Sequence, residues 1–198
     1  MAQAVTGALC RLPLLLALLA LPAAVSAHRD DQYLQATLVA VEPSGVRLQI
    51  NLMPGVAVAG QVLAQIDRDR DGAISQNEAA AYAESLKRDL TLRVDGRTLK
   101  LKLTASEFVE PAELRTGSGI IQMEFSAASG PLAAGAHRLT LENRHLIPMS
   151  VYLFNAAQPS SATIEITGQK RNQNQSAGEI EFIFHPSRPK IAEPSARS

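Results

Sequence analysis

The sequence is poor in the residues that several functional classes require. It has one cysteine, no tryptophan and only 4% aromatic residues, so we expect an aliphatic core without aromatic platforms for stacking bases or sugars. Lys and Arg together number 19, and Asp and Glu also number 19. Without an excess of positive charge to neutralise phosphates, the chain is not expected to bind nucleic acid. Its 46% of hydrophobic residues can bury a core, which argues against disorder.

The N-terminal segment has the pattern of a secretory signal. Arg11 precedes an apolar run from Leu12 to Leu21, and small residues follow up to Ala27. The run is shorter than the roughly 20 residues that span a bilayer. We therefore predict a signal peptide over residues 1–27, a mature chain without a membrane span, and a periplasmic or secreted location. Its removal takes away Cys10, which excludes disulfides, thiol catalysis and thiolate metal sites.

Most of the remaining chain alternates apolar and polar residues with a period of two, as in strands with one buried face. The stretch from Val46 to Leu52 is one example. Asp95-Gly96 separates two more, Leu90–Val94 and Leu99–Leu103, and this dipeptide is typical of a hairpin turn. Eight or nine such stretches predict a mainly β fold, in the form of an immunoglobulin-like antiparallel β-sandwich.

The stretch from about 54 to 90 changes to a helical period around an acidic loop. One apolar stripe precedes the loop and a second follows it, with the spacing of one helix face. The members are Ala59, Val62, Leu63 and Ile66 before the loop, and Ala79, Tyr82, Ala83 and Leu86 after it. This pattern predicts two helices that the loop joins.

The loop itself, residues 67–78, reads DRDRDGAISQNE. Aspartates at alternate positions supply short carboxylates, Gly72 permits a sharp turn, and the longer Glu78 side chain can bind with both oxygens. Without a cation these carboxylates would repel one another. We therefore predict one Ca²⁺ as the cofactor. The predicted ligands are Asp67, Asp69, Asp71, the carbonyl of Ala73, Ser75 and Glu78.

These positions match the calcium loop of the EF-hand family, D-x-D-x-D-G-x-I-x-x-x-E, so residues of about 59–86 resemble a single EF-hand. EF-hands usually pair, and no second loop occurs in this sequence. A lone hand must pack on another surface, and the sheets provide one. The resulting organisation is a β-sandwich domain over 28–185, with the EF-hand inserted at about 54–90, and a flexible tail over 186–198.

A looser resemblance concerns the whole mature chain. An exported β-rich segment that begins with His28, the acidic loop before Glu78, and the run LTLRVDGR from Leu90 resemble the extracytoplasmic domain preceding HupE/UreJ-type nickel/cobalt permeases. The resemblance implies an alternative function, a periplasmic accessory protein that handles Ni, Co or Cu for a permease. Its partner would then be a membrane or extracellular protein.

Two further functions, chelation of a transition metal and catalysis, have little support in the residues. His28, as the N-terminal residue after cleavage, could chelate Cu(II) or Ni(II) through its amine and imidazole. Four scattered histidines without such a role explain the sequence equally well. The sequence has no G-x-S-x-G elbow, and nothing orders Glu107 and Glu110 as a catalytic carboxylate pair. We therefore predict a calcium-binding structural or binding module that is not an enzyme.

Overall fold

The computed structural model describes residues 31–186. The predicted signal peptide (residues 1–27), His28 and all but the first residue of the predicted tail lie outside these residues. Within them the chain forms ten strands, three α-helices and one 3₁₀ turn. In chain order the elements are β1 (Tyr33–Glu42), β2 (Gly45–Pro54), α1 (Val56–Ile66), α2 (Gln76–Asp89), β3 (Leu90–Val94), β4 (Arg97–Thr98), β5 (Lys102–Glu107), α3 (Pro111–Arg115), β6 (Ile121–Ala128), β7 (Gly135–Asn143), the 3₁₀ turn η1 (Ile147–Met149), β8 (Ser150–Ala156), β9 (Ile164–Arg171) and β10 (Ala177–Phe184).

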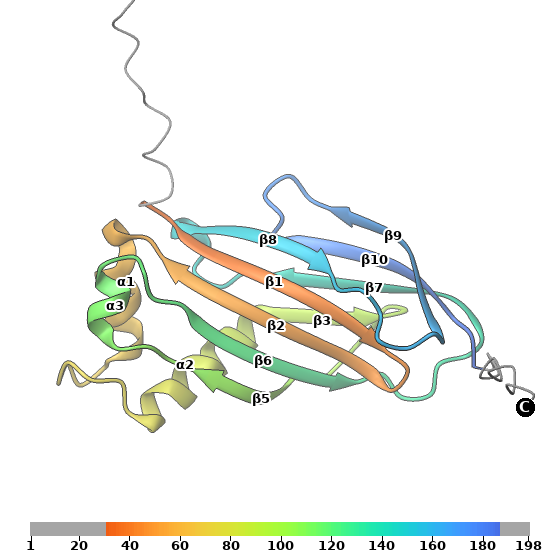
Figure 1. Ribbon diagram of the computed structural model, residues 1–198, viewed down its shortest axis with the longest axis horizontal. Helices are drawn as coiled ribbons and strands as arrows, with labels where there is room; N and C mark the ends of the chain where they lie inside the picture. Colours follow the sequence, from red (N-terminus) through yellow and green to blue (C-terminus); the bar gives the residue numbers. More distant parts are fainter. Residues whose placement is uncertain (1–30, 187–198) are drawn as a thin grey trace, which may run out of the picture.

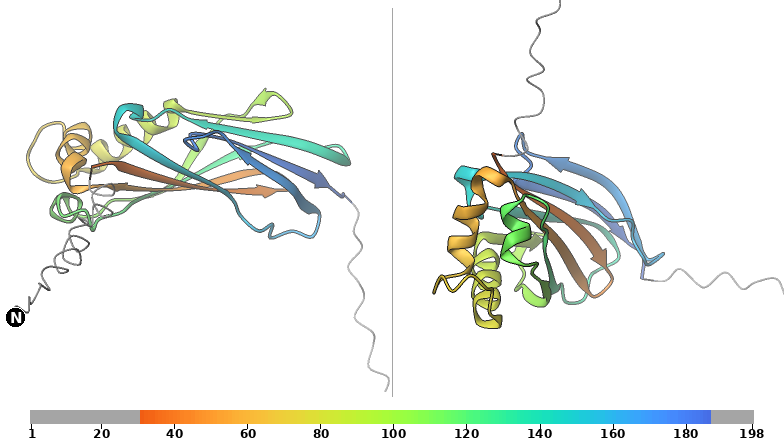
Figure 2. Two further views of the ribbon diagram at one scale, coloured as in Figure 1. Left: turned by 90° about the horizontal axis from the view of Figure 1, so that it is seen from above. Right: turned by 60° about the vertical axis from the view of Figure 1, so that its left-hand side comes forward.

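The strands form two five-stranded sheets that lie one over the other (Figures 1 and 2). Sheet A has the strand order β5-β6-β2-β1-β8, and sheet B has the order β4-β3-β7-β10-β9. Inward-facing residues of both sheets share one core, among them Leu48 and Ile50 of sheet A and Leu139 and Ile180 of sheet B, which are fully buried. The predicted mainly β fold is confirmed. The core is not purely aliphatic, because Phe125, Phe154 and Phe182 are buried in it as well.

The prediction of purely antiparallel strands is wrong at one pair. β1 and β8 run parallel, with Tyr33 beside Ser150 and Val39 beside Ala156. The chain reaches β8 from β7 of sheet B through a crossover of residues 144–149, which contains η1. A tight hairpin forces neighbouring strands to be antiparallel, but a crossover between sheets does not.

The Asp95-Gly96 turn forms as predicted, but its second strand is short. Both residues have positive φ angles, 50° and 78°, as a type I′ turn requires. Pairing of β3 with β4 ends at Thr98, and β5 joins sheet A beside β6. The predicted strand over Leu99–Leu103 is therefore wrong for its first half. Leu99 and Leu101 pack against the core, so their apolar alternation belongs to a segment that crosses between the sheets.

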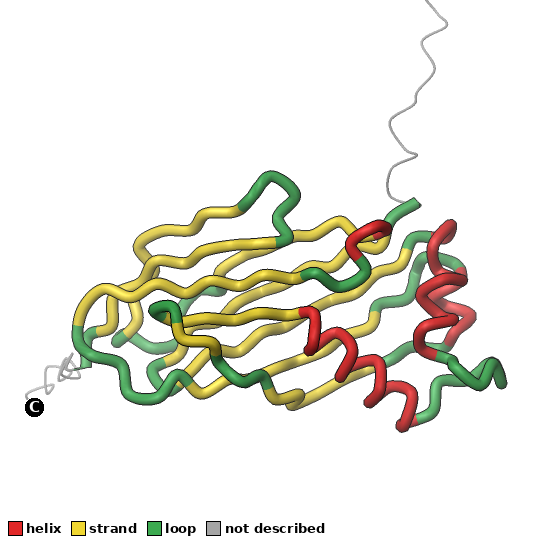
Figure 3. The backbone as a smooth tube through the Cα atoms, turned by 180° about the vertical axis from the view of Figure 1, so that it is seen from behind, coloured by secondary structure: helices red, strands yellow, loops and turns green. Residues whose placement is uncertain are grey.

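The three helices gather at one end of the two sheets (Figures 1 and 3). α1 and α2 each bury one face. The buried residues are Val58, Ala59, Val62, Leu63 and Ile66 of α1, and Glu78, Tyr82, Ala83 and Leu86 of α2. The short α3, which starts at Pro111, was not predicted from the sequence. Within residues 31–186, no helix is both long enough and apolar enough to cross a membrane.

One edge of sheet A is covered by side chains of sheet B. The free edge of β8 forms hydrogen bonds with side chains of residues in and after β9. Gln169 Oε1 accepts from Ala156 N at 2.7 Å, and Arg171 Nε donates to Phe154 O at 2.6 Å. Gln175 Oε1 accepts from Phe154 N at 3.4 Å. These bonds satisfy backbone groups that an edge strand would otherwise leave exposed, and they join the two sheets on this side.

Candidate metal centre

The acidic loop lies between α1 and α2, at the end of the molecule where the helices gather (Figure 3). α2 begins with a capping box. Ser75 Oγ accepts from Glu78 N at 3.3 Å, and Glu78 Oε2 accepts from Ser75 N at 3.0 Å. This arrangement satisfies two backbone donors that a helix start leaves unpaired. The sequence S-x-x-E thus fixes where the loop ends and the helix begins.

The structure brings three of the predicted ligands together. Asp67, Asp69 and Asp71 each offer a carboxylate oxygen, and these oxygens lie within 4.8 Å of one another. Asp67 is 8% exposed, whereas the other two aspartates are exposed. In the part of the chain that the structure describes, this is the sole group of three or more His, Cys, Asp or Glu side chains placed in this way.

Backbone N–H groups of the loop hold each of these carboxylates in place. Asp67 Oδ2 accepts from Gly72 N at 3.1 Å, Asp69 Oδ1 accepts from Asp71 N at 3.2 Å, and Asp71 Oδ1 accepts from Ala73 N at 2.8 Å. Each bond uses one oxygen of its carboxylate. The second oxygen of each carboxylate is thereby available as a ligand, and the loop keeps the three carboxylates oriented without one.

Asp67 has an oxygen that no described group satisfies. Its Oδ1 is buried and has no hydrogen-bond partner among residues 31–186. A buried polar atom without a partner is destabilising, and such an atom in a native structure calls for an explanation. A cation bound among the three aspartates would supply the partner. The donor set consists of carboxylate oxygens, which suit hard divalent cations such as Ca²⁺ and Mg²⁺.

Glu78 connects the two ends of the loop. Its Oε1 accepts from Arg68 N at 2.7 Å, and its Oε2 accepts from Ser75 Oγ at 2.7 Å. These hydrogen bonds, with the Ser75 bonds first, lower the pKa of Glu78 from 4.5 to about 2. Glu78 is therefore ionised. The residue is buried, but its carboxylate does not join the aspartate group. Ser75 is likewise engaged in the capping box, and Ala73 contributes its N–H to Asp71.

Two residues of the loop, Arg70 and Gly72, have positive φ angles. Gly72 has φ of 87°, in the left-handed region that favours glycine. Arg70 also has a positive φ, 62°, which is uncommon for a residue with a long side chain. Ile74 is partly buried and packs against the core, so the loop is attached to the body of the protein by its apolar residue.

A polar cluster beside α2, buried except for Asp89, was missed in the sequence. We call it the polar junction, and it consists of Tyr33, Tyr82, Asp89 and His145. Tyr33 and Tyr82 share a hydrogen bond of 2.7 Å between their hydroxyls, and His145 contacts Tyr82 OH at 3.1 Å and Asp89 Oδ2 at 2.7 Å. The one usable signal was Tyr82 within the buried helical stripe, because a buried tyrosine hydroxyl needs a partner.

The other described histidines also pair with single carboxylates. His137 Nδ1 lies 2.7 Å from Asp95 Oδ2, and His185 Nε2 lies 3.1 Å from Glu165 Oε2. None of these pairs belongs to a group of three possible metal ligands among residues 31–186. The chelate predicted at His28 lies outside the described residues.

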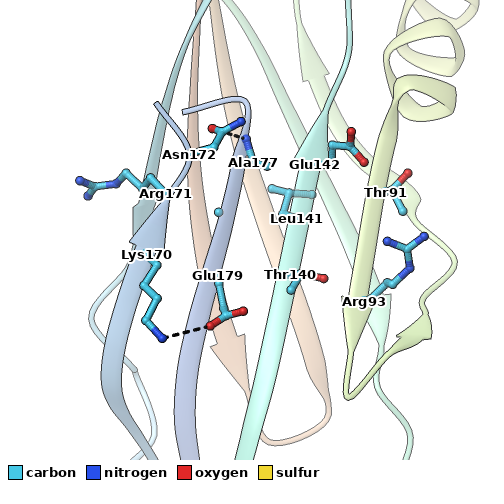
Figure 4. Close-up of a pocket in the computed structure, with 11 residues that line it drawn as sticks. Thr91, Arg93, Thr140, Leu141, Glu142, Lys170, Arg171, Asn172, Ala177 and Glu179 are labelled. Carbon is cyan, nitrogen blue, oxygen red and sulfur yellow. Dashed lines mark hydrogen bonds and ion pairs between the residues drawn. The ribbon is translucent and has the colours of Figure 1, made fainter. Parts of the chain in front are cut away.

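A groove of about 420 Å³ crosses the outer face of sheet B (Figure 4). Arg93, Glu142, Lys170 and Glu179 line it, together with the hydroxyls of Thr91 and Thr140 and with other residues. Lys170 reaches Glu179 at 3.5 Å and Glu181 at 2.8 Å, so its charge is matched within the protein. The side chain of Arg171 points away from the groove (Figure 4) and bonds to β8. This groove does not bring together groups of a recognisable reaction.

Comparison with models of known protein families gives no match for this chain, and a comparison with curated protein sequences also gives none.

Proposed function

We propose that this protein binds one Ca²⁺ in the loop between α1 and α2, in the manner of a single EF-hand. The proposal rests on the group of three aspartates, above all on the buried Asp67 Oδ1, which lacks a partner among the described residues. Asp67, Asp69, Asp71, the Ala73 carbonyl, Ser75 and Glu78 would hold the ion. When bound, Ca²⁺ supplies positive charge and accepts six to eight oxygen ligands.

The hydrogen bonds of the loop support this proposal independently of the residue pattern. Carboxylates held by Gly72 N, Asp71 N and Ala73 N keep their orientation, so less conformational entropy is lost when an ion binds. Ionised Glu78 adds a further negative charge between the loop ends. Carboxylates favour Ca²⁺ over the softer transition metals, which prefer imidazole and thiolate ligands.

We propose that calcium has a structural role in an exported, immunoglobulin-like β-sandwich, periplasmic or secreted, that is not an enzyme. α1 and α2 are joined by the loop, and both bury their apolar faces against the body of the protein. An ion held between them would fasten the helices to each other. An ion that binds only the folded protein adds about 2.7 kcal/mol of stability at a hundredfold excess over its dissociation constant.

Titration calorimetry of the chain that starts at residue 28 tests the proposal. We expect one Ca²⁺ to bind per chain, and Glu78→Gln to lower the affinity by at least about tenfold, because the ion loses a charged ligand. Glu84→Gln is the matched control, since Glu84 lies on the same helix and pairs with Lys87 on the surface. The proposal fails if the unaltered chain binds no Ca²⁺, or if the two variants bind it equally.

The alternative function, an accessory role in Ni, Co or Cu handling for a permease with a membrane or extracellular partner, comes from the resemblance of the mature chain, and His28 is a residue that could chelate such an ion. The same titration with Ni²⁺ and Cu²⁺ distinguishes the two functions. Tight binding of these ions that His28→Ala removes would favour the alternative. If the unaltered chain and His28→Ala bind Ni²⁺ and Cu²⁺ weakly and equally, calcium remains the proposed ligand.

A further inference from the structure

One face of α2 joins the acidic loop to the polar junction. Glu78, Tyr82 and Asp89 are four and then seven residues apart, so they lie on the same side of the helix. Glu78 contacts the loop, whereas Tyr82 and Asp89 contact His145. A single helix of 14 residues carries all three. Any movement of α2 at one end must therefore move the other.

His145 connects this helix to sheet A. Both of its ring nitrogens face α2, Nδ1 toward Asp89 and Nε2 toward Tyr82, and the ring is 2% exposed. Its backbone carbonyl accepts from Gln35 Nε2 at 2.8 Å and from Tyr152 OH at 3.0 Å. The next residue of the crossover, Leu146, has a φ of 50°. The His145 ring thus forms hydrogen bonds with α2, and the His145 carbonyl accepts hydrogen bonds from β1 and β8.

The hydrogen bonds of the junction are all satisfied when His145 is neutral. Ionised Asp89 can only accept, so Nδ1 carries the proton, and neutral Nε2 then accepts from the Tyr82 hydroxyl. Tyr82 in turn accepts from Tyr33, and each proton of the chain has a partner. Burial also lowers the pKa of His145, against the opposing effect of Asp89.

Protonation of His145 would reverse this chain. Nε2–H would donate to Tyr82, and Tyr82 would donate to Tyr33. The Tyr33 hydroxyl is fully buried and has Tyr82 as its hydrogen-bond partner among residues 31–186, so its own proton would have no acceptor. A buried donor without an acceptor is destabilising. Separation of α2 from β1 would give the Tyr33 proton an acceptor, because water could then reach both tyrosine hydroxyls.

We propose that His145 is a positioning residue of the calcium site, which binds its ion tightly only while His145 is neutral. This inference rests on the proposed function. Displacement of α2 moves Glu78 relative to Arg68 and so loosens the loop. The groups that face His145 are Asp89 and Tyr82 from α2, with Tyr33 of β1 and Tyr152 of β8 behind them. Of these, Asp89 is the one carboxylic acid.

Reciprocal measurements of calcium affinity and His145 protonation test the inference. Calorimetry at about pH 7.5 and about pH 5 is expected to show an affinity loss of about fivefold or more, within the usual range of coupling between sites. NMR titration of the histidines in the unaltered protein is expected to show that Ca²⁺ lowers the pKa of His145. The metal-free titration reports on the junction without any bound ion.

Three variants separate this coupling from protonation of the ligands themselves. His145→Asn cannot titrate, so its affinity should change with pH only as far as the ligand carboxylates do. Asp89→Asn keeps a hydrogen-bond acceptor at a half-exposed position but removes the charge that favours protonated His145, so the affinity loss should move to lower pH. His137→Asn, the control, alters a histidine paired with Asp95 and should retain the full pH dependence.

The outcomes distinguish the inference from the function on which it rests. If no Ca²⁺ binds at about pH 7.5, both are wrong. If Ca²⁺ binds there but leaves the pKa of His145 unchanged, the positioning role is wrong and calcium binding stands. An equal affinity loss in the unaltered protein and in a folded His145→Asn variant would also overturn the positioning role.

Discussion

Replacement of Asp67 by asparagine should have opposite effects on stability with and without calcium. Asp67 Oδ2 accepts from Gly72 N, and asparagine keeps an oxygen that can do the same. The substitution removes one negative charge from a group of three carboxylates whose oxygens lie within 4.8 Å of one another. It also removes the carboxylate whose Oδ1 is buried without a described partner.

The magnitude follows from the charge separation. At 4.8 Å, two unit charges repel by about 1 kcal/mol in water. The aspartates at 69 and 71 are exposed, so the value for water applies, and loss of both pairs relieves about 2 kcal/mol at low ionic strength. A neutral acceptor for Gly72 N costs about 1 kcal/mol, because hydrogen bonds to ionised groups are roughly twice as strong. The net gain for the metal-free protein is about 1 kcal/mol.

Thermal unfolding in chelator and in calcium measures both effects. In chelator, Asp67→Asn should raise Tm by about 2–4 °C, the usual shift per kcal/mol for a domain of this size. At a hundredfold excess of Ca²⁺ over the dissociation constant, the unaltered protein gains about 2.7 kcal/mol. The variant, which lacks the buried ligand, should gain little. The order of the two melting temperatures is therefore expected to reverse.

Asp31→Asn is the control, because Asp31 is exposed and lies outside the loop. It should leave both melting temperatures unchanged. The reasoning is refuted if Asp67→Asn is less stable than the unaltered protein in chelator as well. That result would mean that Asp67 acts chiefly as a hydrogen-bond acceptor for the loop, and that repulsion among the carboxylates is weak.

Two further predictions concern packing and pH. Gly178→Ala should lower the free energy of unfolding, measured in urea, by about 1–3 kcal/mol, because the new Cβ would lie 2.6 Å from Cγ of the Phe154 ring. Gly60→Ala, which places its Cβ in a helix where no atom lies within 4 Å, should instead raise this free energy by up to about 1 kcal/mol. Equal effects of the two substitutions would contradict the predicted overlap at Gly178. Burial opposes protonation of His137, but hydrogen bonds to Asp95 and to the Ala133 carbonyl, with the charge of Asp95, raise the pKa of His137 above 6.5. The His137–Asp95 pair therefore stabilises the fold below pH 6.5, and this stabilisation is lost as the pH rises through the raised pKa. NMR titration should show a lower His137 pKa in Asp95→Asn, and an unchanged value would contradict the pairing.

The elements that could be predicted from the sequence are those with a local cause. The two helices follow from stripes that recur within one helical turn, and the capping box needs only Ser75 and Glu78. The Asp95-Gly96 turn needs two residues that tolerate positive φ. The approach of three aspartates likewise depends on neighbours, because their carboxylates bond to N–H groups no more than five residues away.

The features that the sequence could not predict depend on contacts between distant residues. The hydroxyls of Tyr33 and Tyr82 meet across 49 positions, and Gln35 meets Ser150 across 115. No periodic pattern encodes such pairs, since the same residues could face solvent. The parallel pairing of β1 with β8 is of this kind as well. It arises because the crossover carries the chain from one sheet to the other, which alternation within either strand cannot reveal.

The side chains of Gln169, Arg171 and Gln175 that cover the edge of β8 make the two lateral sides of the molecule unequal. On that side, separation of the layers would break hydrogen bonds to backbone amides. On the opposite side, β5 is exposed along most of its length and is joined to its sheet through β6 alone. Slow fluctuations of the two sheets should therefore begin at β5, and amide hydrogens there should exchange with solvent well before those of β8.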